Sequence, residues 1–316
     1  MSLSTIIAAA VNKQNFLTIA DYIEFCKTYL GFIEQGLQAV IISQNENKYC
    51  FYQYREDGHF NITRPINSEL MYDSTQFSEI SDNLLNVLAS VRDLAIDDVS
   101  SRTQIIKAIY TIQQSIGAAL DALPAGESNK ARKLNGDLFE RFIRLLIQAI
   151  GIVCNTGTVQ VPVYLGGDLQ FSTSYQHDLL LYKERELKVI GSVKTSSKDR
   201  IDKIFMDKFL YCKLTETALP HIAIFLNDVQ RKKTRRENEY RVNSTFLSGH
   251  FKAYTVKLNP LDGVYYCDIR PNMQQDNLLR QYIRTIDHFF CSDVWTFIES
   301  EGLPLSEIEV EEQPEL

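Results

Sequence analysis

The expected fold of this chain rests on residues 177–194, which read HDLLLYKERELKVIGSVK. An apolar run starts at Asp178, a charged turn follows at 183–186, and a second apolar run ends at Lys194. Two apolar runs joined by a short polar turn are typical of a β-hairpin. Because the strands of a hairpin run in opposite directions, we expect Asp178 to lie beside Lys194 at one end of a sheet.

An aspartate beside a lysine at the end of a sheet suits the hydrolysis of a phosphodiester bond. The carboxylate of Asp178 can hold a divalent metal ion, and the amine of Lys194 can place and help to deprotonate the attacking water. Ser192 is two residues before Lys194 and therefore shares its face of the strand. The alternative interpretation is a surface salt bridge between Asp178 and Lys194 that has no chemical role.

The residues after Lys194 predict a helix over about 200–217. Its buried face is formed by apolar residues at helical spacing: Ile201, Ile204, Phe205, Phe209 and Leu210. Asp207 lies on the other side of this helix, one turn after Lys203. It can therefore be a functional carboxylate or one half of a surface pair with Lys203.

The order and spacing of these residues resemble the Type II restriction endonucleases of the PD-(D/E)XK superfamily that cut sites with a CC/GG core, in particular the SsoII/EcoRII-like branch. In that group a small residue, here Ser192, replaces the acid two positions before the lysine. The missing carboxylate comes from the following helix after twelve intervening residues, and twelve residues separate Lys194 from Asp207. The resemblance implies that Asp178, Lys194 and Asp207 are catalytic and that both aspartates bind metal.

A further motif of this group lies upstream. Residues 135–140 (NGDLFE) resemble its G-x-x-F-E helix opening, which implies Glu140 as another catalytic, metal-binding carboxylate. The alternative is a surface pair between Glu140 and Arg144, one helical turn later. The resemblance also implies that Lys130 and Arg132 bind DNA from a loop that precedes the helix.

A basic-acidic-basic triplet, Lys198-Asp199-Arg200, stands four residues after the lysine, as it does in this group. The resemblance implies that the triplet reads C:G pairs in the major groove. Lysine and arginine can donate to guanine O6 and N7, and aspartate can accept from cytosine N4. The chain departs from the group at His177, where a proline is usual, and at Asp207, where glutamate is commoner.

The net charge of −7 is unevenly distributed along the chain of 316 residues. Residues 299–316 contain seven glutamates and no lysine or arginine, whereas residues 183–213 hold nine basic and five acidic residues. Residues 231–236 add five basic residues within six. Because DNA affinity depends on local neutralisation of phosphates, the acidic total does not exclude a DNA-binding protein. The basic run can equally be a solvated surface.

Scattered cysteines and ordinary hydrophobicity indicate a cytoplasmic protein. The six cysteines form no CxxC motif, so we expect reduced thiols and no zinc site. No stretch approaches the roughly 20 apolar residues of a membrane span. The N-terminus lacks the charged start of a secretory signal.

The pattern of apolar residues predicts an α/β fold with a mixed central sheet flanked by helices, which the resemblance describes as restriction-endonuclease-like. Three parts are expected: an N-terminal helical and β-meander portion (1–125) with an accessory role that can include contacts to DNA, a catalytic core (126–298) and an acidic tail (299–316). The helices are expected at about 5–35, 77–91, 101–123, 136–151, 200–217 and 276–299. Besides the strands of the 159–194 hairpin, strands are expected at 37–43, 48–54, 60–63, 221–226, 251–258 and 264–269.

The function that the resemblance implies is site-specific cleavage of double-stranded DNA with one or two Mg²⁺ ions per site, leaving 5′-phosphate ends. The core sequence can be CCNGG or CCGG. A near-palindromic site calls for two active sites related by a two-fold axis, hence a homodimer. A cognate DNA methyltransferase is implied as a genetic partner only. A repair or nicking nuclease and a non-catalytic DNA-binding module of the same fold remain open as alternatives.

Overall fold

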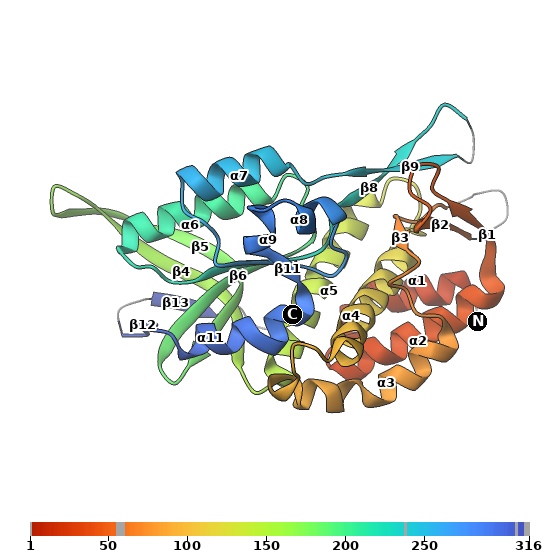
Figure 1. The fold of residues 1–316 in the computed structure, drawn as a ribbon, viewed down its shortest axis with the longest axis horizontal. Helices are drawn as coiled ribbons and strands as arrows, with labels where there is room; N and C mark the ends of the chain where they lie inside the picture. Colours follow the sequence, from red (N-terminus) through yellow and green to blue (C-terminus); the bar gives the residue numbers. More distant parts are fainter. Residues whose placement is uncertain (1, 55–60, 237–238, 307–308, 313–316) are drawn as a thin grey trace.

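The computed structural model describes residues 2–54, 61–236, 239–306 and 309–312, and its centre is a mixed β-sheet (Figure 1). The strands of this sheet are β4 (Val153–Leu165), β5 (Asp168–Lys183), β6 (Glu186–Ser196), β7 (His221–Asn227), β10 (Gly263–Tyr266), β11 (Ile283–Thr285), β12 (Leu303–Pro304) and β13 (Glu309–Glu312). They follow the order β11-β10-β7-β6-β5-β4-β13, and β12 pairs with β6. The α/β class expected from the sequence is confirmed.

Strands β5 and β6 form the antiparallel hairpin that the sequence predicts. Leu179, Leu180 and Leu181 are completely buried, because helices cover both faces of the sheet at this point. Strand β6 then pairs in parallel with β7, and β7 with β10. The C-terminal ends of β6 and β7 therefore meet at one edge of the sheet.

Helices cover the two faces of the sheet. The helices next to it are α5 (Ser128–Ala149), α6 (Ile201–Thr215) and α7 (Ser248–Lys257). On β7, Ala223 and Phe225 pack in one cluster with α6 and α7, whereas Ile222 and Ile224 pack in another cluster that includes α5. This alternation along the strand places α5 and α6 on opposite faces.

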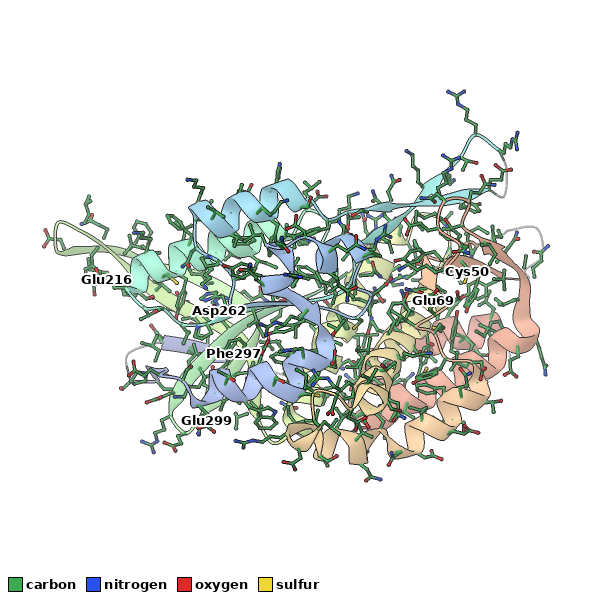
Figure 2. All side chains as sticks on the ribbon, in the orientation of Figure 1. Cys50, Glu69, Glu216, Asp262, Phe297 and Glu299 are labelled. Carbon is green, nitrogen blue, oxygen red and sulfur yellow. The ribbon has the colours of Figure 1, made fainter. Side chains whose placement is uncertain are left out.

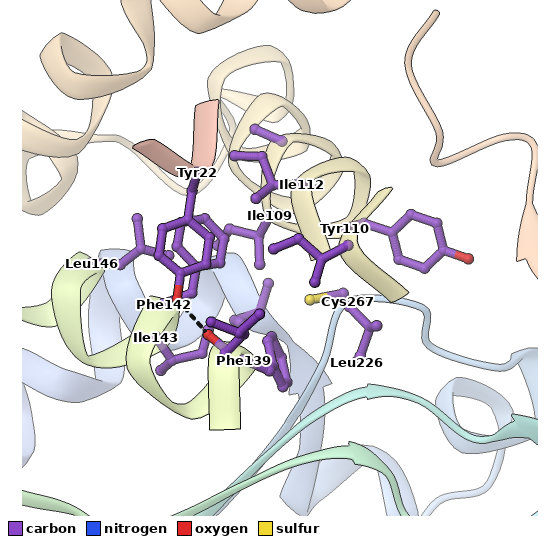
Figure 3. Packing of buried hydrophobic residues seen from close by; sticks show 14 of the residues in the cluster. Tyr22, Ile109, Tyr110, Ile112, Phe139, Phe142, Ile143, Leu146, Leu226 and Cys267 are labelled. Carbon is purple, nitrogen blue, oxygen red and sulfur yellow. Dashed lines mark hydrogen bonds between the residues drawn. The ribbon is translucent and has the colours of Figure 1, made fainter. Parts of the chain in front are cut away.

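The N-terminal part packs directly against α5. It contains α1 (Leu3–Val11), a 3₁₀ turn (Lys13–Asn15), α2 (Ile19–Gly36), β1 (Leu37–Ile42), β2 (Tyr49–Tyr54), β3 (Ile66–Asn67), α3 (Ser74–Ala89), a 3₁₀ turn (Val91–Asp93) and α4 (Val99–Leu120). The ring of Tyr22 stacks on Phe142 at a centroid distance of 4.7 Å, and its hydroxyl donates to the carbonyl of Leu138 at 2.8 Å (Figure 3). One hydrophobic core therefore joins the N-terminal helices to the helix that carries Glu140.

The remaining elements lie after β7. They are β8 (Val229–Lys233), β9 (Tyr240–Ser244), α8 (Pro271–Gln275), α9 (Leu279–Tyr282), α10 (Ile286–His288), a π-helix (Phe289–Asp293) and α11 (Val294–Glu299). Strands β8 and β9 form a separate two-stranded hairpin. In the part of the chain that the structure describes, no helix is long and apolar enough to cross a membrane.

Two expected elements were assigned to the wrong type. Residues 251–258 were expected to form a strand, but most of them belong to α7, in which Phe251 and Thr255 are buried one helical turn apart. The helix expected over 276–299 is interrupted, because Ile283–Thr285 pairs in parallel with β10 as an edge strand. Pairing with β10, which lies outside the local stretch of sequence, overrides the local helical pattern.

Three boundaries also differ from expectation. Helix α5 begins at Ser128, eight residues before the expected start, so Lys130 and Arg132 lie in its first turns and not in a loop. Within the acidic tail, Glu309–Glu312 adds a strand beside β4. The strand expected at 60–63 is represented by a single bridge between Ile62 and Gln53, and the turn expected before it lies outside the described residues.

Candidate active site

The position of Asp178 follows from the point at which β5 and β6 separate. Their pairing ends at Leu179 and Gly191. Just beyond this point, the carboxylate of Asp178 accepts a hydrogen bond from the backbone N–H of Val193 at 2.8 Å. The side chain therefore replaces the strand partner that this N–H has lost, and the bond holds the carboxylate at the end of the hairpin.

Lys194 connects two carboxylates from different elements. Its Nζ donates to Asp178 Oδ2 at 2.5 Å and to Glu140 Oε1 at 2.8 Å. The three side chains come from β6, β5 and α5, and they are 16–30% exposed. The cluster is therefore shielded from bulk water but open to a ligand.

Helix α5 brings Glu140 to this cluster. Leu138, Phe139 and Phe142 are completely buried and fix the helix in the core. Asp137, which directly precedes Leu138, forms an ion pair with Lys13 at 2.7 Å. The N-terminal part thus helps to orient the helix face on which Glu140 lies.

The electrostatics of the cluster show an excess of negative charge. Burial and the neighbouring carboxylate of Asp178 raise the pKa of Glu140 to about 7, although Lys194 opposes this shift. Burial alone would lower the pKa of Lys194, but the two carboxylates outweigh it and raise that pKa above its usual value. Near neutral pH, therefore, Lys194 is charged and Glu140 holds a proton part of the time.

These groups fit a magnesium ion in type and charge. Mg²⁺ is commonly held by one or two carboxylates together with water and substrate phosphates. Asp178 and Glu140 supply two such carboxylates, and the single cation of Lys194 lies between them. Among the described residues, no group of three or more histidine, cysteine, aspartate or glutamate side chains is placed so that it could hold a metal ion.

Asp207 lies apart from this cluster. Its carboxylate is 4.0 Å from Lys203 on the same helix, the i,i+4 pair that the sequence allows. Burial raises the pKa of Asp207, and its charge acts on Tyr175 of β5. In the described part of the chain, Asp207 forms no metal-holding group of three with Asp178 and Glu140. The structure thus brings Asp178, Lys194 and Glu140 together, and the role of Asp207 as a metal ligand stays a prediction.

The triplet Lys198-Asp199-Arg200 is exposed just before α6, at the same edge of the sheet as Lys194. Asp199 has a positive φ of 53°, which turns the chain sharply between the strand and the helix. Lys198 Nζ donates to Gln230 at 3.1 Å. The triplet therefore presents two donors and one acceptor from a bend that the fold supports.

Lys130 and Arg132 are also exposed, on the first turns of α5. Lys130 forms an ion pair with Glu127 at 2.8 Å, and Arg132 donates to Asn129 at 3.4 Å. Both contacts are local, between residues three apart in sequence. These local contacts do not test the DNA-binding role of Lys130 and Arg132, which stays a prediction.

A buried pair of histidines adjoins the site and was not found from the sequence. His177 is buried with its ring 6.4 Å from that of His221, and both face Tyr211 of α6. Burial lowers the pKa of His177 to about 4 and that of His221 to about 3, so both are neutral at physiological pH. His177 belongs to the packing under α6. The sequence offered one signal for this buried pair, because His221 begins the apolar run that forms β7.

The sheet order, the flanking helices and the position of the cluster define a restriction-endonuclease-like α/β fold. The crystal structure of the Type IIP restriction endonuclease Kpn2I is similar to this chain, with a TM-score of 0.67 and 17% sequence identity. The match covers 95% of this chain and 98% of the Kpn2I chain. A complex of the restriction endonuclease PspGI with substrate DNA matches 71% of this chain and 95% of its own, with a TM-score of 0.37 and 13% identity. No protein-family model and no curated protein matches the chain.

Proposed function

We propose that this protein is a Mg²⁺-dependent, site-specific endonuclease that cuts double-stranded DNA at a site with a CC/GG core of the CCNGG or CCGG type. The observation that carries the proposal is the position of Lys194 between Asp178 and Glu140 at the end of a hairpin in this fold. The likeness to Kpn2I extends over 95% of this chain and supports the fold on which the proposal rests.

Each residue of the cluster has a distinct proposed role. Asp178 and Glu140 would hold Mg²⁺, and the sequence resemblance implies Asp207 of α6 as a third ligand. When bound, Mg²⁺ would supply stabilisation of the charge that develops at the phosphate and a lower pKa for the attacking water. Lys194 orients the attacking water and takes part in its deprotonation, and Ser192 fills the place of the absent acid. The products carry 5′-phosphate ends.

Recognition is proposed for the exposed triplet. Lys198 and Arg200 are the donors for guanine O6 and N7, and Asp199 is the acceptor for cytosine N4. Lys130 and Arg132 contact the backbone or the minor groove. Because the core is near-palindromic, two copies of the chain related by a two-fold axis cut the two strands, and a methyltransferase of the same specificity protects the host DNA.

Digestion of phage DNA with and without Mg²⁺, followed by sequencing of the fragment ends, tests this function. Discrete fragments that end at one CC/GG-core site, only with Mg²⁺, are the expected result. Nicks in one strand without a palindrome would instead support a repair or nicking nuclease. Metal-independent binding without cleavage would support a non-catalytic DNA-binding module.

A further inference from the structure

The hairpin of β8 and β9 is the most basic projecting element of the described chain, and the proposed active site uses none of its residues. Residues 229–244 contain six basic and two acidic residues. The hairpin begins two residues after β7 ends, at the edge of the sheet where Lys194 lies. Figure 1 shows it leaving the body of the molecule, and Figure 2 shows its side chains extending into solvent.

The inner face of this hairpin is firmly anchored. Val229 and Val242 are buried against aromatic residues of β2. The ring of Tyr240 lies 5.4 Å from that of Phe51. The side chain of Asn45 both donates to and accepts from the backbone of Val242, each at 2.9 Å. The N-terminal meander therefore holds the hairpin in one orientation.

One of the basic residues belongs to this anchoring. Arg231 donates to the carbonyls of Ile62 and Thr63, at 2.5 and 3.2 Å, and its guanidinium lies 5.5 Å from the ring centre of Tyr240. Its donors are directed at the protein. A role in binding a partner therefore falls to the residues of the opposite face.

The outer face places two cations directly opposite each other. Side chains alternate along a strand, so Lys232 and Arg241 lie on the face opposite Arg231 and Val242. The register pairs Lys232 with Arg241, and both are exposed. Like charges across a strand pair are destabilising. Within the described residues neither has an ion pair with an acid, so no acid among those residues relieves their repulsion.

This outer face is continuous with the recognition triplet. Gln230 is the outward residue next to Lys232 on β8, and it accepts the hydrogen bond from Lys198 Nζ at 3.1 Å. At the base of the hairpin, Thr245 contacts the hydroxyls of Ser196 and Ser197, at 3.4 and 3.3 Å. A connected row of polar and basic side chains thus runs outward: Lys198, Gln230, Lys232 and Arg241.

We propose that the outer face of the β8–β9 hairpin binds backbone phosphates of duplex DNA beside the recognition core, a proposal that rests on the proposed function. Paired cations with a neighbouring amide suit phosphate oxygens, which fix the register of a protein on DNA without reading its sequence. A phosphate between Lys232 and Arg241 also removes their mutual repulsion. The hairpin thereby supplies affinity and orientation, whereas the triplet supplies specificity.

The test compares the full-length protein with the double variant Lys232→Gln/Arg241→Gln. A matched control, Arg185→Gln/Lys213→Gln, removes two exposed charges near the other ends of β6 and α6. Binding without divalent metal is measured at several NaCl concentrations. One duplex extends at least one helical turn beyond a CCGG core on each side, and a second ends a few base pairs from the core.

On the long duplex, we expect the slope of log K against log salt to fall by about 1.8 for the hairpin variant, with affinity on the order of 10- to 100-fold weaker at 0.1 M salt. The control variant should show little change on either duplex, and the hairpin variant should show little change on the short duplex. If the wild type binds and cleaves duplex DNA while the hairpin variant matches the control, this inference fails and the proposed function stands. If the wild type binds no duplex DNA, both fail.

Discussion

Glu140 Oε1 accepts a hydrogen bond from Lys194 Nζ at 2.8 Å, although the two residues are 54 positions apart in the chain. The contact joins a helix buried against the N-terminal part to the strand that ends the central hairpin. It completes a cluster in which the ammonium group of Lys194 donates to both Asp178 and Glu140.

Lys194→Ala is expected to reduce cleavage by about 10²- to 10⁴-fold, because it removes the group that positions and helps to deprotonate water. DNA binding should be largely retained, since the ammonium group of Lys194 is already paired with two carboxylates. Single-turnover cleavage and a binding assay check the two parts. Lys213→Ala, at an exposed site on α6, is the control. Cleavage near the wild-type rate would show that the active site lies elsewhere.

The raised pKa of Glu140 predicts that the apparent Mg²⁺ affinity depends on pH. A metal ion competes with the proton, so the affinity should fall by up to tenfold per pH unit below pH 7 and level off above it. Mg²⁺ titrations of cleavage at pH 6, 7 and 8 measure this. Glu140→Gln should weaken Mg²⁺ binding and flatten the pH dependence. An unchanged profile in this variant would assign the titration to another group.

Asp207→Asn tests the carboxylate that the structure leaves apart from the cluster. If Asp207 is a ligand, the Mg²⁺ concentration for half-maximal cleavage should rise by about 10- to 100-fold. Asp202→Asn, on the same helix but near His250, is the matched control. Equal effects of the two substitutions would remove Asp207 from the metal site and leave Asp178 and Glu140 as its carboxylates.

Arg200→Ala is expected to cost about 1–3 kcal/mol of discrimination at one G:C pair, because a bidentate contact to guanine would be lost. Cleavage of a substrate set with single changes in the core measures this. Arg185→Ala removes an exposed arginine at the β5–β6 turn and should leave discrimination intact. A uniform loss on all substrates would identify Arg200 as a phosphate contact.

The buried ion pair between Arg102 and Asp287 predicts a large effect on stability. Their side chains are 8% and 7% exposed and lie 2.7 Å apart, joining α4 to α10. Asp287→Ala leaves the guanidinium buried without a counter-charge and should cost about 3–5 kcal/mol. Asp82→Ala breaks the exposed pair with Lys27 and should cost less than about 1 kcal/mol. Urea unfolding compares them, and equal losses would contradict the prediction.

The local spacing of apolar residues predicted the strands that form the site. It was not sufficient where a segment's structure depends on residues far away in the sequence. The hairpin that carries Asp178 and Lys194 was predicted correctly, because strongly apolar runs and a charged turn leave little ambiguity. Residues 251–258 were wrongly expected to form a strand, since a short alternating run suits either state. The edge strand at Ile283–Thr285 was missed because its pairing with β10 overrides a helical pattern.

The sequence by itself determined which chemical groups stand at the end of the hairpin, because the two-residue period of strands and the turn at 183–186 set the register of Asp178 and Lys194. Only the tertiary structure decided which further groups meet them. Packing of the N-terminal helices on α5 directs Glu140 to Lys194, and packing of α6 on the opposite face of the sheet places Asp207 apart from both. Such contacts depend on how buried surfaces fit together, which no local spacing encodes.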